Sequence, residues 1–146
     1  MDTIMLKRKI EDQLLGWYNT KSFKPALLVA GARQVGKTTS IRSFGKKHYQ
    51  SVIEINFEAQ RSLKEIFSKD LDANTILEKI SVAGLGRLIP NNTLIFFDEI
   101  QSCPEARTSI KFLVEDGRYD IISSGSLLGI NYKEVSSYPV GYEYKR

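Results

Sequence analysis

The first residues whose types and spacing suggest chemistry form a glycine-bearing segment. Gly31, Gly36, Lys37 and Thr38 fit the pattern G-x-x-x-x-G-K-[ST]. A loop of this kind wraps its backbone N–H groups around phosphate oxygens, and the helix that follows points its positive end at the same anion. The pattern therefore predicts a phosphate-binding P-loop.

Individual residues of this loop have expected roles. Lys37 would neutralise the β- and γ-phosphates of a nucleotide, the Thr38 hydroxyl would bind Mg²⁺, and Thr39 would contact the α-phosphate. The nucleotide-binding segment as a whole comprises Gly31, Ala32, Arg33, Gln34, Val35, Gly36, Lys37, Thr38 and Thr39. A glycine turn that carries an exposed lysine is the alternative interpretation.

A pair of acids follows an apolar run further along the chain. Residues 94–97 read Leu-Ile-Phe-Phe and lead directly into Asp98 and Glu99, which is the Walker B arrangement. We expect Asp98 to hold Mg²⁺ through water and Glu99 to polarise the water that attacks the γ-phosphate. The alternative is a strand that ends in a solvated acidic turn.

Serines form the third candidate group. The run Ser123-Ser124-Gly125-Ser126 ends another apolar segment. A small polar side chain at the end of such a strand can reach the γ-phosphate or the attacking water. Ser124 and Ser126 are the candidates for this sensor role, with Ser124 ahead. A serine-rich turn with only local hydrogen bonds is the alternative.

Two further residues with reactive side chains have no partners at catalytic spacing. We expect His48 to be a surface histidine and Cys103 to be a small buried or turn residue before Pro104. Because Cys103 is the one cysteine of the chain, an internal disulfide and a cysteine-based zinc cluster are both excluded.

The elements that must position these residues alternate between strands and helices. Continuous apolar runs predict strands over residues 26–30, 51–57, 93–97 and 119–123. Apolar stripes at helical spacing predict helices over residues 7–18, 37–44, 61–67, 74–89 and 104–116. This alternation predicts a parallel sheet with helices on both faces. The candidate groups would then lie at the carboxyl edge of the sheet, where such folds bind ligands.

Length and composition agree with one folded domain. The chain has 146 residues, of which 42% are hydrophobic and 26% are charged. No apolar run approaches the roughly 18 residues of a membrane span, and residues 1–12 lack a signal-peptide core. We therefore expect a cytoplasmic protein with no membrane partner.

Positive charge gathers in the first third of the chain. Residues 1–50 hold 10 Lys and Arg against 3 Asp and Glu, whereas residues 51–146 hold 11 against 14. A basic surface of this kind could bind DNA. A solvated helix face together with phosphate-binding lysines is the favoured interpretation, because no aromatic residue is interleaved at a stacking spacing.

Taken together, these segments resemble the N-terminal ATPase region of a bacterial and archaeal family of AAA-type P-loop ATPases. The resemblance rests on GARQVGKTT, IEINFE, LIFFDEIQSCPEA, SIKFLVED, SSGSLLGI and SYPVGYEY. It implies an α/β, three-layer P-loop fold with strand order 5-1-4-3-2 and with ATP and Mg²⁺ as ligands. Family members usually continue into a C-terminal region of uncharacterised, sometimes nuclease-like, function.

The resemblance also implies a domain organisation and partners. Residues 1–24 would form an amphipathic helix and a connection, and residues 25–146 an ATPase core that is cut short before a lid or second domain. A partner subunit in an oligomer would supply an arginine finger, for which Arg107 and Arg118 are candidates. Tyr142 stands where the family commonly has a basic residue.

Three features remain without an assigned role. The resemblance draws attention to Gln101 and Lys111. Residues 135–146 alternate in apolar character, which predicts that the fifth strand is either this segment or missing.

The sequence thus predicts the ATP-binding and Mg²⁺-dependent, ATP-hydrolysing core of an AAA-type ATPase. Two alternatives stay open. One is a nucleotide-dependent switch or interaction module with little hydrolysis, and the other is a domain that binds DNA through its basic first third.

Overall fold

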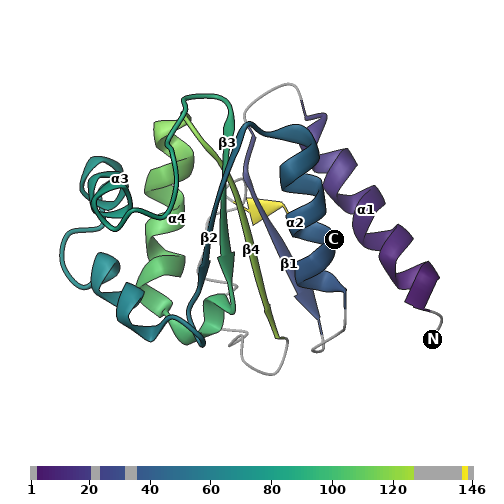
Figure 1. Ribbon diagram of the computed structural model, residues 1–146, viewed down its shortest axis with the longest axis horizontal. Coiled ribbons are helices and arrows are strands. Elements are labelled where there is room, and N and C mark those ends of the chain that lie inside the picture. Colours follow the sequence, from purple (N-terminus) through teal and green to yellow (C-terminus); the bar gives the residue numbers. More distant parts are fainter. Residues whose placement is uncertain (1–2, 21–23, 32–35, 127–142, 145–146) are drawn as a thin grey trace.

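Among the residues that the structure describes, a parallel sheet of five strands forms the centre of the molecule (Figure 1). The structure is a computed structural model, and it describes residues 3–20, 24–31, 36–126 and 143–144. The strands are β1 (Ala26–Gly31), β2 (Ser51–Asn56), β3 (Thr93–Asp98), β4 (Asp120–Ser126) and β5 (Glu143–Tyr144). They lie in the order β2-β3-β4-β1-β5, and every pairing is parallel. The α/β class and the expected strand order are confirmed.

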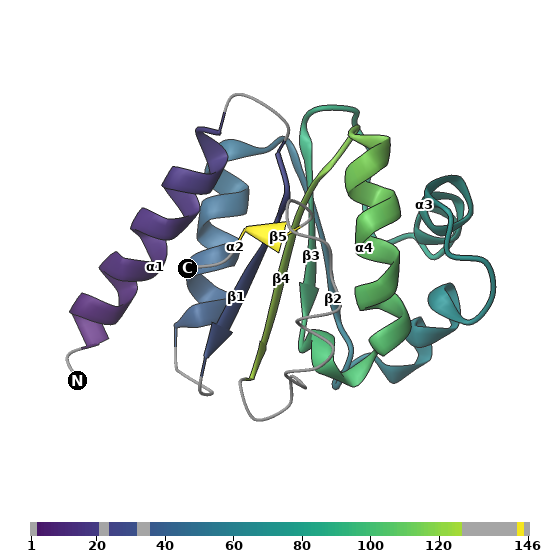
Figure 2. The same ribbon diagram turned by 180° about the vertical axis from the view of Figure 1, so that it is seen from behind.

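Helices cover both faces of the sheet and complete three layers (Figures 1 and 2). One face carries α1 (Thr3–Tyr18) and α2 (Lys37–His48). The other carries α3 (Ala73–Val82) and α4 (Pro104–Asp116). Two short 3-10 helices, η1 (Arg61–Phe67) and η2 (Ile100–Ser102), precede α3 and α4. The expected three-layer architecture is confirmed.

The β3 strand runs through the middle of the core, and each of its residues is buried. Leu94 and Phe96 belong to the apolar cluster of α1 and α2, whereas Ile95 and Phe97 belong to the cluster of α3 and α4. Successive side chains of a strand point to opposite faces, so the unbroken apolar run serves both layers. The strand therefore places Asp98 at the carboxyl edge of the sheet, next to a tightly packed core.

The first helix is fastened to the sheet by its apolar stripe. Leu14 and Trp17 are fully buried in the same cluster as Leu27 of β1. The Trp17 indole N–H also donates to the Pro25 carbonyl oxygen at 2.6 Å. The predicted amphipathic helix is confirmed, although it begins at residue 3 instead of residue 7.

The prediction of a helix over residues 74–89 is wrong at its end, because α3 stops at Val82. Gly84 and Gly86 follow with φ angles of +70° and +153°, which a residue with a Cβ rarely adopts. A Cβ added at Gly86 would lie 3.0 Å from the Ile53 side chain of β2. The segment after α3 thus turns back against the outer strand of the sheet.

Several other boundaries differ from the expected ones. α2 continues to His48, four residues past the predicted end, and β4 continues to Ser126, so the serine run is strand and not turn. His48 is half-buried at the surface instead of fully exposed, because its ring centre lies 4.6 Å from that of Tyr18 and 4.4 Å from that of Phe44. β5 falls within the segment predicted as a fifth strand, of which residues 135–142 lie outside the described residues.

Replacing Tyr49 with Phe should lower the free energy of unfolding by about 1–2 kcal/mol. The Tyr49 hydroxyl donates to Asp120 Oδ2 at 2.6 Å, which joins the residue after α2 to the first residue of β4. Burial and this bond raise the pKa of Tyr49, so the hydroxyl keeps its proton at neutral pH. Urea denaturation measures the effect, and Tyr18→Phe is the matched control because no described residue bonds to the Tyr18 hydroxyl. Equal losses in the two variants would contradict the assignment.

Candidate functional site

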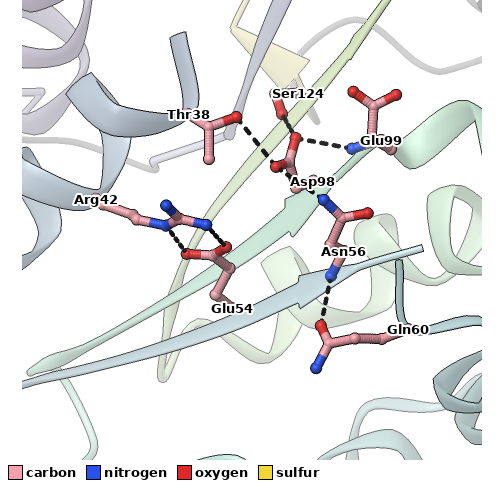
Figure 3. A network of polar contacts seen from close by, with 8 residues as sticks. All are labelled: Thr38, Arg42, Glu54, Asn56, Gln60, Asp98, Glu99 and Ser124. Atoms are coloured by element: carbon pink, nitrogen blue, oxygen red, sulfur yellow. Dashed lines mark hydrogen bonds and ion pairs between the residues drawn. The ribbon is translucent and has the colours of Figure 1, made fainter. Parts of the chain in front are cut away.

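The candidate residues meet where β1, β3 and β4 end and α2 begins (Figure 3). The strands are in register at this edge, so that Gly31 lies opposite Ser126 and Asp98 lies opposite Asn56 at the end of β2. Parallel strands end at the same edge of a sheet, which brings residues far apart in the sequence together. The order of the strands in the sheet therefore brings the residues of the site together.

The start of α2 has the backbone that a phosphate-binding loop needs. Gly36 caps the helix with a φ of +104°, a conformation that favours glycine. Lys37 is buried, with 7% of its surface exposed, and its Nζ donates to the Gly125 carbonyl oxygen at 3.0 Å. The alternative of an exposed lysine is thus contradicted, while residues 32–35 of the predicted loop lie outside the described residues.

Asp98 is the centre of the polar network at this edge. Its side chain is buried, and Thr38 Oγ1 donates to Oδ2 at 3.1 Å while Ser124 Oγ donates to Oδ1 at 2.6 Å (Figure 3). The contact of Ser124 with a residue 26 positions away contradicts the alternative of a turn with only local bonds. Three predicted residues from α2, β3 and β4 are therefore in direct contact.

Asn56 is a member of this network that sequence reasoning missed. Its Nδ2 donates to Asp98 Oδ2 at 3.4 Å, and its Oδ1 accepts from the backbone N–H groups of Glu58 and Ala59 at 3.0 and 2.9 Å. Gln60 Oε1 in turn accepts from the Asn56 backbone N–H at 3.0 Å (Figure 3). The signal that could have found Asn56 is its position at the end of a predicted strand.

An ion pair borders the network on the side of α2. Arg42 donates through Nε and Nη2 to both carboxylate oxygens of Glu54, each at 2.7 Å (Figure 3). The hydrogen bonding and the charge of Glu54 raise the pKa of Arg42. The pair links α2 to β2, and neither residue had an expected role.

Glu99 follows directly at the end of β3 in an uncommon backbone conformation. Its φ is +56°, in the left-handed region, and its N–H donates to Asp98 Oδ1 at 3.0 Å. Its carboxylate oxygen Oε2 accepts from Gln101 Nε2 at 2.8 Å. Glu99 is thus half-buried and hydrogen bonded, which differs from the alternative of a solvated acidic turn.

A cavity of about 500 Å³ opens beside this network. Thr38, Arg42, Asn56, Asp98 and Glu99 contribute to its wall. The hydroxyl and carboxylate oxygens in this wall are the hard donors that Mg²⁺ prefers. No group of three His, Cys, Asp or Glu among the described residues could hold a metal by itself. The site fits an ion that is bound jointly with phosphate and water, as Mg²⁺ commonly is.

The remaining candidates lie apart from Asp98 or face elsewhere. Ser126 is the last residue of β4, and the Thr39 side chain is exposed. Arg107 is only 4% exposed, which argues against a finger that reaches a neighbouring subunit. Arg118 is exposed and bound to Asp116, whose pKa it lowers through a hydrogen bond.

Three more features of the sequence lie elsewhere or outside the described residues, and any role for them stays a prediction. Lys111 Nζ lies 4.9 Å from the centre of the Phe112 ring, and Tyr142 lies outside the described residues. Cationic side chains of the first third are exposed on two helices, namely Lys7, Arg8, Lys9, Lys46 and Lys47.

Across the described ranges, no helix is both long and apolar enough to span a membrane.

Comparisons with known proteins agree with this geometry. The model of a family described as "AAA domain" matches residues 23–145. The replication factor C large subunit of Thermococcus kodakarensis is 28% identical over 152 residues, which cover 100% of this chain and 29% of that protein. A solved structure of Drosophila ORC bound to AT-rich DNA and Cdc6 matches with a TM-score of 0.58 and 15% identity, over 97% of this chain and 55% of that one.

Proposed function

Since this chain belongs to the AAA domain family, we propose that it binds ATP together with Mg²⁺ at the carboxyl edge of its sheet and hydrolyses the bond between the β- and γ-phosphates. The observation that carries the proposal is the 3.1 Å hydrogen bond between Thr38 Oγ1 and Asp98 Oδ2. It joins the first turn of the helix after the P-loop to the acid at the end of β3. A hydroxyl and a carboxylate side by side are oxygen donors that would hold the Mg²⁺ that nucleotide hydrolysis requires.

The phosphate groups would bind at the backbone of Gly36 and at the ammonium group of Lys37. The Lys37 ammonium group is positioned at the end of β4 by its bond to the Gly125 carbonyl oxygen. A phosphate oxygen is a stronger partner for an ammonium group than a backbone carbonyl, because the bond is then between opposite charges. Lys37 would therefore turn from Gly125 to the β- and γ-phosphates when nucleotide enters.

The metal would be held by Thr38 and Asp98. When bound, Mg²⁺ supplies positive charge that offsets the charge developing on the phosphate oxygens. The Thr38 hydroxyl and the Asp98 carboxylate already lie within hydrogen-bond distance of each other, so little movement is needed to present both. Ser124, which donates to Asp98 Oδ1, would orient the carboxylate or report the state of the γ-phosphate.

Glu99 would act as the general base. Its carboxylate accepts a proton from water while the water oxygen bonds to the γ-phosphorus. The bond from that phosphorus to the β–γ bridging oxygen breaks, and ADP and inorganic phosphate leave. Because a positioned base contributes roughly 10²- to 10⁴-fold in rate, Glu99 is the residue on which turnover depends most.

The partners and the cellular location of this domain form a separate part of the proposal. The chain spans 29% of the length of the replication factor C relative, and the matched solved structure is one of Drosophila ORC bound to AT-rich DNA and Cdc6. We propose that this domain works with a partner subunit or further region that supplies an arginine finger. DNA is the second candidate partner, through the exposed cationic helices. We also propose a cytoplasmic location.

Titration calorimetry with ATP, combined with an assay of phosphate release, tests the proposed function. We expect ATP to bind in the presence of Mg²⁺ and to bind roughly tenfold more weakly with EDTA, since a metal bridge adds more than one charge-assisted contact. GTP titrated in parallel tests the base preference that the family membership suggests. Absence of ATP binding would refute the proposal, whereas binding without steady phosphate release would favour a nucleotide-dependent switch.

A further inference from the structure

The carboxylate of Glu99 has a hydrogen-bond donor two residues along the chain. Gln101 Nε2 donates to Glu99 Oε2 at 2.8 Å. Asp98 holds the same residue by its backbone, because the Glu99 N–H donates to Asp98 Oδ1 at 3.0 Å. The proposed base is thus held both by its backbone and by its side chain.

The backbone conformation of Glu99 needs such support. Its φ and ψ angles of 56° and 50° lie in the left-handed region, which is unfavourable for a residue with a Cβ. Residues persist in this region when their surroundings hold them there, and they concentrate at functional sites. The conformation turns Glu99 so that its side chain meets that of Gln101, which ordinary helical spacing at two residues would not allow.

Gln101 stands on a rigid base. Its neighbours Ile100 and Cys103 are 0% and 2% exposed, and both belong to the apolar cluster of α4. Within this short helix, the Ser102 N–H donates to the Glu99 carbonyl oxygen at 3.0 Å, and the Cys103 N–H donates to that of Ile100 at 3.1 Å. The backbone that carries the Gln101 amide is therefore fixed relative to the core.

The carbonyl oxygen of the same amide has no comparable partner among the described residues. Gln101 Oε1 is buried, and no hydrogen-bond donor among the described residues reaches it. A buried acceptor without a donor is unfavourable, so packing alone does not explain an amide at this position. A methionine would fill similar space without a buried unpaired oxygen. What the amide provides is the bond to Glu99.

We propose that Gln101 is the positioning residue of Glu99, whose amide holds one carboxylate oxygen so that the other is directed at the attacking water. This inference rests on the proposed hydrolysis, because it assigns a support to the proposed base. Gln101 touches neither nucleotide nor water in this role. A small misplacement of a base lowers the rate of the chemical step far more than it lowers substrate binding.

Gln101→Met tests the inference, because it keeps the length of the side chain and removes the donor. We expect kcat for ATP hydrolysis to fall roughly 10- to 100-fold while KM for ATP changes less than about twofold. The thermal midpoint should stay close to that of the wild type, since the substitution also removes the buried unpaired oxygen. A purely structural role would predict the reverse, a lower midpoint with an intact kcat.

Two further variants complete the experiment. Ser102→Ala is the matched control in the same short helix, and we expect its kcat to equal that of the wild type. Gln101→Glu keeps the shape but sets a carboxylate against Glu99, so its kcat should fall at least as far as that of Gln101→Met, and it serves as the test if the methionine variant does not fold. A wild-type kcat in a folded Gln101 variant would overturn the inference and leave the proposed hydrolysis standing. A wild-type protein that binds ATP without turning it over would reject the hydrolysis itself, and the role of Gln101 with it.

Discussion

Glu99→Gln should abolish ATP turnover and leave ATP binding almost unchanged. The amide of glutamine has nearly the shape of the carboxylate and can still accept a hydrogen bond from Gln101, but it cannot take a proton from water. Loss of a general base lowers kcat by roughly 10²- to 10⁴-fold. Steady-state phosphate release at saturating ATP measures kcat, and calorimetry measures binding of ATP with Mg²⁺.

The control for this variant is Glu65→Gln, which makes the same isosteric change at an exposed position on η1. We expect that variant to hydrolyse ATP at the wild-type rate. If Glu99→Gln did so as well, the base would have to be another group and the assignment of Glu99 would fail. If Glu99→Gln lost binding too, its carboxylate would have a role in holding the metal.

Lys37→Ala should weaken ATP binding roughly 10- to 100-fold, since a charge-assisted hydrogen bond contributes about 1.5–3 kcal/mol. The lysine is the buried cation closest to the proposed phosphate position, and its Nζ bonds to Gly125 at the end of β4. Burial of an ammonium group is itself unfavourable, so the variant should fold with little loss of stability. Calorimetry measures the affinity, and thermal unfolding checks the fold.

Lys47→Ala is the matched control for this second variant, because Lys47 lies on the same helix with an exposed side chain. It should bind ATP as the wild type does. ATP affinity that is unaffected by Lys37→Ala would remove the P-loop assignment, whatever the behaviour of the other site residues. An equal loss in both variants would indicate general electrostatic attraction instead of a specific contact.

The part of the site that sequence reasoning found is the part that follows from strand ends. Thr38 belongs to the P-loop pattern, and Asp98 and Ser124 come directly after apolar runs. The rule that parallel strands end at one edge then brought the three together. The same rule applied to β2 would have found Asn56, but no residue of that strand had an expected role, although IEINFE was part of the family resemblance. Its contact depends on β2 lying next to β3, which only the family resemblance implied.

Other differences have local causes that apolar periodicity does not record. The apolar spacing of α3 continues past Val82, yet the left-handed glycine at position 84 ends the helix. The Arg42–Glu54 pair joins two polar residues on different elements, and neither has a partner nearby in the sequence. His48 looked solvent-exposed beside two lysines, but the aromatic rings of Tyr18 and Phe44 cover it. The backbone conformation of a glycine decided the first case, and contacts between elements decided the other two.

The Asp98 carboxylate is fully occupied in this structure. Its Oδ1 accepts from Ser124 and from the Glu99 backbone, and its Oδ2 accepts from Thr38 and Asn56. A carboxylate offers about four acceptor positions, so a cation could reach either oxygen directly only by exchange with one of these donors. A metal-bound water is itself a hydrogen-bond donor, so it can replace one of these donors and keep the carboxylate fully hydrogen bonded. Competition with these donors thus favours a contact between Asp98 and the metal through water. It also means that residues such as Ser124 and Asn56 can change the metal affinity without touching the metal.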